Sequence, residues 1–370
     1  MTSRTRLLLV FGGDSSEHEI SCLTAKGVLA AVDAERFDVT CVGIARGGRW
    51  VRVDRAVVES YAIRDGRLPS VENDLQEAVL VRHRGGVAVA GRDGDLLEDV
   101  TPVDVAFALL HGPFGEDGTI QGLFEMYGLR YVGAGVLSSA VCQDKVAMKQ
   151  QLAACGLPVG PSVTVTDHAW RTDPERCLDD VDRLTFPVFV KPARGGSSIG
   201  ITRVTGRDGM AAAIDAARLH DPKVIVEQGF VGMREIECAV LGDSGGAAPH
   251  TSLPGEILVH TDDKFYDFTL KYLPGQPVEV VAPADLALAV SERVRDVAAA
   301  AFTGLGVEGL ARVDTFVLAD GEVVVNEVNT MPGFTPTSGY PLMWAATGLD
   351  YAALVTRLVE LALARPVGLR

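Results

Sequence analysis

One stretch of the chain, LARVDTFVLADGEVVVNEVN at residues 310–329, restricts the possible folds more than any other. Two runs rich in β-branched residues flank Asp320-Gly321, a dipeptide typical of tight β-hairpin turns. A two-residue loop fixes the register of the hairpin and decides which side chains share a face. The stretch therefore predicts an antiparallel hairpin with one polar face and one apolar face, the apolar face carrying Val313, Val317 and Val328.

The polar face of this hairpin carries four side chains that suit a metal site. A two-residue loop places Asp314 opposite Glu327 and Arg312 opposite Asn329. Two carboxylates directly opposite each other repel unless a cation lies between them. Carboxylate and amide oxygens suit Mg²⁺ or Mn²⁺, which usually share their coordination shell with substrate phosphates. The alternative is a solvated face on which Arg312 forms ordinary salt bridges.

The N-terminal third alternates apolar runs with helical and polar segments. LLLVFGG (7–13), FDVTCVGI (37–44) and VDVAFALLHG (103–112) have the composition of buried parallel strands. This alternation predicts an open α/β domain with ligand-binding groups at the carboxyl ends of its strands. Residues 51–100 lack a clear period, and we expect short exposed strands and loops there.

Two helices are predicted with defined ends. The first runs from about Ser139 and stops at Gly156, because Gly with a Pro shortly beyond it is a usual C-terminal signal. The second covers residues 351–364, where leucines recur at helical spacing and Asp350 is the expected N-cap. We expect this second helix to serve the core and not the function.

Composition excludes several classes of partner. The net charge is −15 and no dense run of Lys or Arg occurs, which argues against nucleic acid and anionic membranes. The six cysteines are far apart and form no C-x-x-C, so we expect reduced thiols in a cytoplasmic protein. No segment approaches the ~20 apolar residues of a membrane span, and the N-terminus lacks the pattern of a signal peptide.

The segment VKPARGGSSIG, residues 190–200, has the composition of a phosphate-binding loop. Lys191 ends an apolar strand directly before the glycines, and the backbone N–H groups of Gly195 to Ser198 can form an anion-binding concavity. Lys145 and Lys271 are further candidates for phosphate contacts. Taken singly, each lysine is more simply a surface residue, and only the combination with the hairpin carboxylates indicates a nucleotide site.

Two acidic loops follow the first and third apolar runs. In HGPFGEDGTIQG (111–122), Glu116 and Asp117 form either part of a site or an acidic turn that caps the next helix. In GGDSSEHEIS (12–21), Glu17 and His18 are either functional or solvated. The glycines there lack the G-x-G-x-x-G spacing, so a dinucleotide site and a dehydrogenase are weakly supported.

Together, these segments resemble the motifs of the D-alanine–D-alanine ligases of the ATP-grasp superfamily. The match runs from Phe11 to Pro341, and the order of the motifs makes it specific. The motifs are HGPFGEDGTIQG, DK at 144–145, VKPARGGSSIG, EQGFVGMRE, FYDFTLKY, ARVD and NEVNTMPGFTPTSGYP.

The resemblance implies a three-domain ATP-grasp fold of the α/β class, with an α+β ATP-grasp part. Residues 1–133 would form the N-terminal α/β substrate-binding domain. Residues 134–228 would form the central subdomain with the phosphate-covering loop. Residues 229–370 would carry the metal-binding hairpin and an omega loop, with the nucleotide held between two antiparallel sheets.

The resemblance also assigns roles to residues of the ATP site. Two magnesium or manganese ions would bind Asp314, Glu327 and Asn329, and a monovalent cation is compatible with the family. The nucleotide contacts would come from Lys145, Lys191, Gly196, Ser197 and Ser198 for the phosphates, Lys271 near the γ-phosphate, Glu227, Gln228 and Phe230 for adenine, and Glu235 for the ribose.

Further residues match the positions that bind the amino acids. Glu17 would bind the ammonium group of the first D-alanine, with His111 nearby, and Ser338 would hold the carboxylate of the second. Arg312 and the backbone N–H of Gly333 would bind the oxyanion of the tetrahedral intermediate. A hydrogen-bonded triad would join Glu17, Ser197 and Tyr272, and Tyr272 favours D-alanine over D-lactate as second substrate.

The leading hypothesis is therefore an ATP-dependent ligase that joins two D-alanine molecules for peptidoglycan synthesis. The reaction would pass through a D-alanyl phosphate, and family members are usually homodimers. The nearest rival uses D-lactate or D-serine as acceptor. A non-catalytic nucleotide-binding protein on the same fold is a second rival, which the presence of all three metal-ligand residues disfavours.

Overall fold

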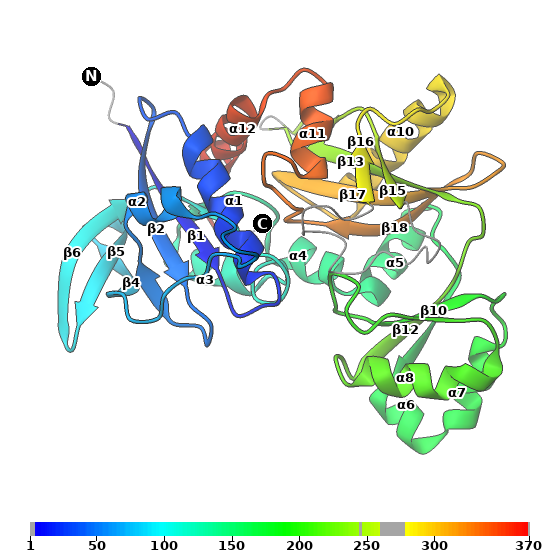
Figure 1. Ribbon diagram of the computed structural model, residues 1–370. Helices are drawn as coiled ribbons and strands as arrows, with labels where there is room; N and C mark the ends of the chain where they lie inside the picture. Colours follow the sequence, from blue (N-terminus) through cyan, green and yellow to red (C-terminus); the bar gives the residue numbers. More distant parts are fainter. Residues whose placement is uncertain (1–3, 244–245, 260–277, 369–370) are drawn as a thin grey trace.

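The computed structural model describes residues 4–243, 246–259 and 278–368. Its N-terminal part is an eight-stranded sheet with the order β6-β5-β4-β3-β2-β1-β7-β8 (Figure 1). The strands are β1 (Thr5–Gly12), β2 (Phe37–Ile44), β3 (Trp50–Arg52), β4 (Glu77–His83), β5 (Gly86–Asp93), β6 (Leu96–Val103), β7 (Val105–Ala108) and β8 (Arg130–Tyr131).

The parallel core of this sheet is the one predicted from the apolar runs. β1 pairs in parallel with β2 and with β7, and its central residues are fully buried. The expectation for residues 51–100 was wrong in one respect, because β4 to β6 are long strands that extend the sheet antiparallel, and β5 is largely buried.

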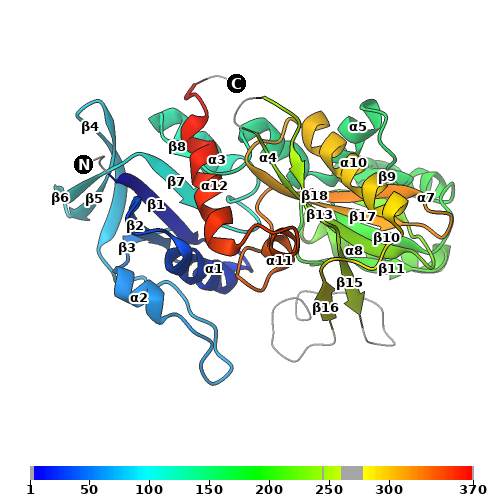
Figure 2. The same ribbon diagram turned by 90° about the horizontal axis from the view of Figure 1, so that it is seen from above.

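The last helix of the chain belongs spatially to this first sheet. α12 (Tyr351–Ala364) packs beside α1 (His18–Ala31), and Leu354 and Leu358 join the same apolar core as Leu7 and Leu9 (Figure 2). The predicted N-cap is confirmed, since Asp350 Oδ1 accepts a hydrogen bond from Ala353 N at 2.8 Å. The remaining helices of this part are α2 (Arg55–Ser60) and α3 (Thr119–Tyr127).

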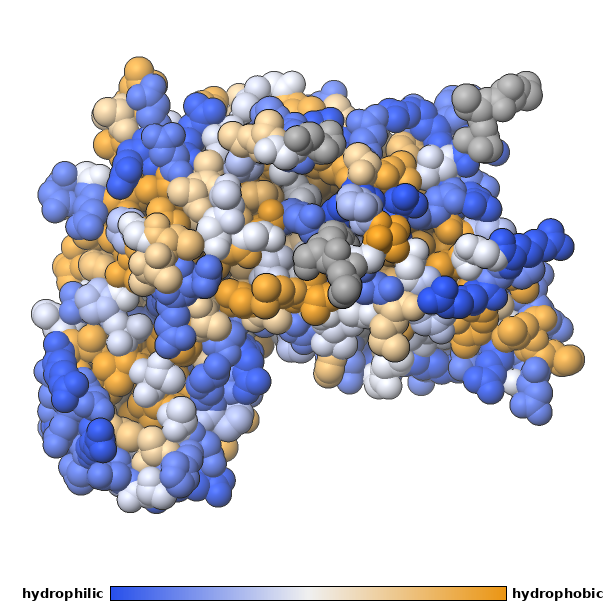
Figure 3. Space-filling model, turned by 180° about the vertical axis from the view of Figure 1, so that it is seen from behind, coloured by the Kyte–Doolittle hydropathy of each residue, from blue (hydrophilic) through white to orange (hydrophobic). Residues whose placement is uncertain are grey.

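The central part is a four-stranded antiparallel sheet with the order β11-β10-β12-β9. With its helices it forms a lobe that projects from the rest of the molecule, seen from behind in Figure 3. Its elements are β9 (Ser162–Thr166), α6 (Asp167–Thr172), α7 (Pro174–Val181), β10 (Val188–Pro192), β11 (Thr202–Val204), the short 3₁₀ turn Arg207–Gly209, α8 (Met210–Arg218) and β12 (Lys223–Gln228).

A third sheet has the order β16-β15-β13-β17-β18, with β14 beside β13, and the described strands pair antiparallel. The two antiparallel sheets expected for an ATP-grasp fold are therefore present. The elements are β13 (Arg234–Leu241), β14 (His250–Thr251), β15 (Gly255–Val259), β16 (Val278–Val281), α10 (Leu288–Gly304), β17 (Leu310–Val317), β18 (Val323–Asn329) and α11 (Gly339–Ala346).

The helix predicted from Ser139 to Gly156 is two helices, α4 (Val136–Gln143) and α5 (Lys145–Ala154). Asp144 leaves the helical conformation between them, and its Oδ1 accepts hydrogen bonds from the backbone N–H groups at the start of α5. An aspartate at this position is a good N-cap, so it begins a new helix instead of continuing the first. The break places Lys145 at the first position of α5.

Candidate active site

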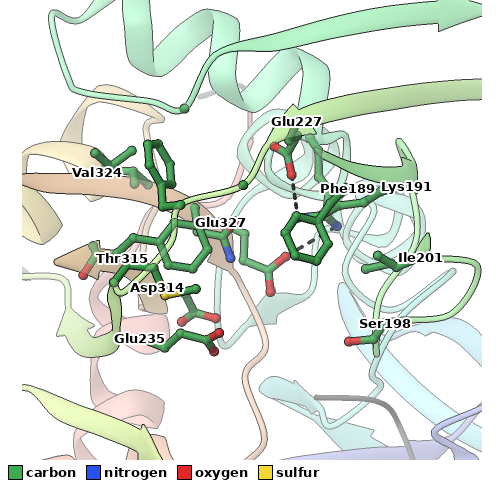
Figure 4. A pocket seen from close by; sticks show the side chains of 18 of the residues that line it. Phe189, Lys191, Ser198, Ile201, Glu227, Glu235, Asp314, Thr315, Val324 and Glu327 are labelled. Carbon is green, nitrogen blue, oxygen red and sulfur yellow. Dashed lines mark ion pairs between the residues drawn. The ribbon is translucent and has the colours of Figure 1, made fainter. Parts of the chain in front are cut away.

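The hairpin opposes its four polar residues as predicted. Asp314 of β17 faces Glu327 of β18, and Arg312 faces Asn329. Asp314, Glu327 and Arg312 line a pocket between the second and third sheets, which we call the nucleotide pocket (Figure 4 labels the two carboxylates). The sequence therefore located this pair of carboxylates correctly.

The loop of the hairpin differs from the prediction, because it has three residues instead of two. Leu318 N donates to the carbonyl of Glu322 at 2.9 Å, and Gly321 adopts a φ of 87°. The ladder shifts back by one residue beyond Asp314, which leaves Asn326 without a partner in the register, as in a β-bulge. The longer loop and the bulge at Asn326 offset each other. The predicted pairing therefore holds at Asp314 and Arg312, and it is wrong by one residue between the bulge and the turn.

Arg312 balances the carboxylates that line the pocket. Its guanidinium binds both oxygens of Asp314 at 2.7 Å and lies 3.1 Å from Glu237 Oε1. Asn329 Nδ2 donates to Asp314 Oδ2 at 3.0 Å. Burial opposes the charged form of Arg312, but Asp314 and Glu237 outweigh it and raise its pKa well above the usual value. Loss of one member of such a group leaves an unpaired buried charge, which typically costs ~3–5 kcal/mol.

A second charge cluster lines the opposite wall of the nucleotide pocket. Glu227 of β12 lies between two lysines, with Lys149 Nζ 2.8 Å from one carboxylate oxygen and Lys191 Nζ 2.5 Å from the other. Burial raises the pKa of Glu227, but the two ammonium groups outweigh that effect and hold it well below its ordinary value. Lys145 Nζ connects the walls, since it donates to Gly195 O at 2.7 Å and lies 3.4 Å from Glu327 Oε2.

The predicted phosphate loop covers this space with an unusual backbone. Ser197 and Ser198 have φ values of 53° and 59°, in the left-handed region that non-glycine residues seldom occupy. Backbone N–H groups in such turns converge and favour anions. The loop also approaches the N-terminal part, because a Cβ on Gly196 would lie 3.9 Å from Glu17 Oε2.

A second pocket, the interdomain pocket, lies between the N-terminal part and the third sheet and adjoins the first. His111 Nδ1 lies 3.0 Å from Met331 O, and Met331 N donates to Glu116 Oε1 at 3.3 Å. Burial and the charge of Glu17 raise the pKa of Glu116 to about 8, against the effect of its hydrogen bonds from Gly112 N and Met331 N. The Nε2 atom of His111 is buried and has no hydrogen-bond partner.

The two open alternatives for the acidic loops have different outcomes. Asp117 belongs to the turn before α3, where its Oδ1 accepts from Thr119 N at 3.0 Å, whereas Glu116 lines the interdomain pocket. Glu17 also lines that pocket. His18 is fully buried, bonds Gly13 O and accepts from Val71 N, so its solvated alternative was wrong and its role here is structural.

The predicted residues divide between these pockets. Lys271 and Tyr272 lie outside the described residues. Those that line the nucleotide pocket are Lys145, Lys191, Gly196, Ser197, Ser198, Glu227, Gln228, Phe230, Glu235, Arg312, Asp314 and Glu327. Those that line the interdomain pocket are Glu17, His111, Lys145, Gly196, Ser197, Arg312, Glu327, Asn329, Gly333 and Ser338.

Two buried residues of the site were missed by the sequence reasoning, Lys149 and Glu237. Lys149 stands four residues after Lys145 on α5, so both lie on one helix face. That spacing was the signal available in the sequence. Glu237 lies opposite Asp314 in the β13–β17 ladder, and a Cβ on Gly339 would lie only 2.9 Å from its Oε2.

The donor set at the hairpin fits a divalent cation shared with phosphates. In the part of the chain that the structure describes, no three His, Cys, Asp or Glu side chains form a metal cluster by themselves. Asp314 and Glu327 with the Asn329 amide supply fewer ligands than an octahedral ion needs, and Mg²⁺ usually completes its shell with water and substrate phosphate. Arg312 lies beside Asp314 and Lys145 beside Glu327, and these cations offset part of the negative charge of the two carboxylates.

Two antiparallel sheets enclose lysines and paired carboxylates beside an open α/β domain, and this arrangement defines the ATP-grasp class. Family models agree in detail: the "D-ala D-ala ligase N-terminus" matches residues 6–134 and the "D-ala D-ala ligase C-terminus" matches residues 151–360. The chain belongs to the D-alanine–D-alanine ligase family, and it is therefore a ligase.

Individual relatives support this assignment. A D-alanine–D-alanine ligase from Arthrobacter sp. (strain FB24) is 51% identical over 100% of this chain and 96% of its own length. One from Kineococcus radiotolerans is 52% identical over 99% of both. Among solved structures, a D-Ala:D-Ser ligase from Enterococcus faecalis is 33% identical, with a TM-score of 0.82 and coverage of 97% and 100%. A D-alanine–D-alanine ligase from Coxiella burnetii is 32% identical, with a TM-score of 0.80 and coverage of 97% and 94%.

Proposed function

We propose that this protein joins two D-alanine molecules to D-alanyl-D-alanine, with conversion of ATP to ADP and phosphate. The observation that carries the proposal is the junction of the two pockets. Lys145, Arg312, Glu327 and the loop residues Gly195 to Ser197 line both. A phosphoryl group at that junction would lie beside a carboxylate held in the interdomain pocket, which is the geometry that phosphoryl transfer requires.

In the first step, the carboxylate of one D-alanine attacks the γ-phosphate and forms a D-alanyl phosphate. Lys145, Lys191 and the N–H groups of the loop hold the phosphates, and the family resemblance assigns Lys271 to the γ-phosphate. Glu17 holds the ammonium group of this first substrate beside His111. Magnesium or manganese bound by Asp314, Glu327 and Asn329 would neutralise charge on the phosphates.

In the second step, the amine of another D-alanine attacks the acyl carbonyl and phosphate leaves. Arg312 and the N–H of Gly333 stabilise the oxyanion, because preorganised donors are most effective where charge develops. Ser338 holds the carboxylate of this second substrate at the start of α11, near Gly333. Tyr272 would join Glu17 and Ser197 and close the loops over the site.

The nucleotide pocket also has a place for a base. Phe230 packs 5.9 Å from Phe316 between ring centroids, and Phe189 and Val324 add apolar surface (Figure 4). Adenine would lie there beside Glu227, Gln228 and Phe230, with Glu235 toward the ribose. The Gln228 side-chain oxygen accepts from Thr185 N at 3.0 Å, and its backbone N–H donates to Pro161 O at 3.0 Å.

Phosphate release from ATP tests the proposal. The assay contains Mg²⁺ and D-alanine, L-alanine, or no amino acid, and further arms add D-serine or D-lactate as acceptor beside D-alanine. We expect release that depends on both D-alanine and the metal, with D-alanyl-D-alanine as the main product. Absence of D-alanine-dependent release would refute the proposal, and a preference for D-lactate or D-serine would correct the acceptor.

The family resemblance also supports a homodimer in the cytoplasm with a role in peptidoglycan precursor synthesis. In the described residues, no helix is long and apolar enough to cross a membrane. Sedimentation of the purified protein across a range of concentrations measures the oligomeric state.

A further inference from the structure

The cluster around Glu227 contains one group to which the proposed reaction gives no task. Lys149 is about as buried as Glu227 itself, at 6% and 5% exposed, and it lines the nucleotide pocket. Its ammonium group lies 2.8 Å from Glu227 Oε1. A lysine buried to this extent needs a reason, because leaving water is costly for an ammonium group.

The fold holds the three members of this cluster from three different elements. Lys149 comes from the second turn of α5, Lys191 from β10 and Glu227 from β12. Each lysine takes a different carboxylate oxygen, so the plane of the carboxylate is held at both ends. Glu227 lines the nucleotide pocket, and a carboxylate oxygen can accept more than one hydrogen bond, so the carboxylate can also accept from a donor on a ligand there.

We propose that Lys149 is a positioning residue that orients the Glu227 carboxylate as an obligate acceptor and thereby selects a 6-amino purine over a 6-oxo purine. This inference rests on the proposed function, which places the nucleotide base beside Glu227. Lys191 is the phosphate-side lysine of the same cluster, so Lys149 is the partner that holds Glu227 on the other side.

The chemistry of the base explains the selection. An ionised carboxylate only accepts hydrogen bonds. The 6-amino group of adenine donates to it, whereas the 6-oxo group of hypoxanthine is another acceptor and would be repelled. A site built for a hydrogen bond rejects an analogue that cannot make it much more strongly than an apolar pocket does. Without Lys149, the carboxylate rotates and takes up a proton more easily, so it also accommodates a 6-oxo group.

The test compares ATP with inosine triphosphate in the D-alanine-dependent phosphate-release assay. For Lys149→Met we expect kcat/KM for ATP to fall ~10-fold and kcat/KM for inosine triphosphate to fall less than ~2-fold. Lys149→Arg keeps the positive charge and should restore most of the wild-type ratio of kcat/KM for ATP to kcat/KM for inosine triphosphate. Lys145→Met is the matched control from the same helix face, and it should lower kcat/KM for both nucleotides by the same factor, because it contacts phosphates.

An equal loss for both nucleotides in Lys149→Met, or no preference for ATP in the wild type, would overturn the inference. If Lys149→Met does not fold, Lys149→Gln, which keeps a donor without charge, takes its place with the same expected direction. Calorimetric binding of ADP and inosine diphosphate gives a second readout without turnover. A wild type that binds ADP selectively but shows no D-alanine-dependent release would refute the proposed function and not this inference.

Discussion

Glu116 links two loops of the active site, and its protonation should be visible in the stability of the protein. Its carboxylate accepts from Gly112 N in the N-terminal part and from Met331 N beyond β18. Its pKa is raised from the usual 4.5 to about 8, chiefly by burial. Below pH 4.5 both states of the protein carry this proton. Between pH 4.5 and 8 the unfolded chain loses it and the folded protein retains it, so stability falls as pH rises through this window.

Glu116→Gln removes this dependence, since an amide does not titrate in the range. We expect the altered hydrogen bonds to lower the free energy of unfolding by a fixed amount. The difference in this free energy between the variant and the wild type should narrow as pH rises. The narrowing should be at most about 1.4 kcal/mol per pH unit between pH 5 and 8. Urea unfolding at three pH values measures it, and parallel stability curves for the two proteins would contradict the prediction.

At the residue scale, the sequence predicted the charges that face each other in a hairpin better than those that meet between elements. Asp314 and Glu327 follow from alternation and register alone. The pairing of Lys149 with Glu227 joins α5, which packs against α10 and β18, to β12 of the second sheet, and no local pattern specifies this. His18 shows the same limit, because its burial depends on Val71, which is far away in the sequence.

At the scale of elements, the hairpin shows a correct register reached from an incorrect loop. The Asp-Gly signal indicated the turn, but a three-residue loop with a left-handed glycine is the next most common solution and uses the same residues. The extra residue is absorbed at Asn326. The break between α4 and α5 was missed because the apolar period continues through Asp144, and only its capping bonds reveal the boundary.

Gly321 should be required for its backbone conformation alone. Its φ is 87°, and a Cβ built there meets no atom within 4 Å. Gly321→Ala should therefore lower the free energy of unfolding by about 1 kcal/mol through strain, with kcat unchanged. Gly321→Asn should cost less, because asparagine tolerates the left-handed region. Equal losses for both variants in urea unfolding would mean that the loop conformation is not the cause.

At the scale of the whole molecule, the last described helix, α12, packs against the N-terminal sheet. The apolar side of α12 completes the core of the N-terminal sheet, although the second and third sheets lie between them in sequence. The sequence predicted this helix and its N-cap, but not the sheet against which it packs. Periodicity identifies an apolar face and carries no information about its partner.

A substitution of Leu358 tests how much the packing of α12 contributes to stability, since the Leu358 side chain is fully buried in the shared core. Leu358→Ala should destabilise the protein by about 2–5 kcal/mol, the usual range for a buried leucine. Thr356→Ala, on the same helix but only partly buried, is the matched control and should cost far less. Urea unfolding of both variants measures the difference, and similar losses would show that α12 contributes little to the core.

The position of α12 also affects how the protein forms in the cell. Translation produces the N-terminal sheet first and α12 after every other described helix and strand. Until then, α1 covers the face at β1, whereas the part of the same face over β7 and β8 lacks the helix that packs on it in the complete fold. The nascent chain therefore carries uncovered apolar surface at this edge of the sheet until the last described helix has been synthesised.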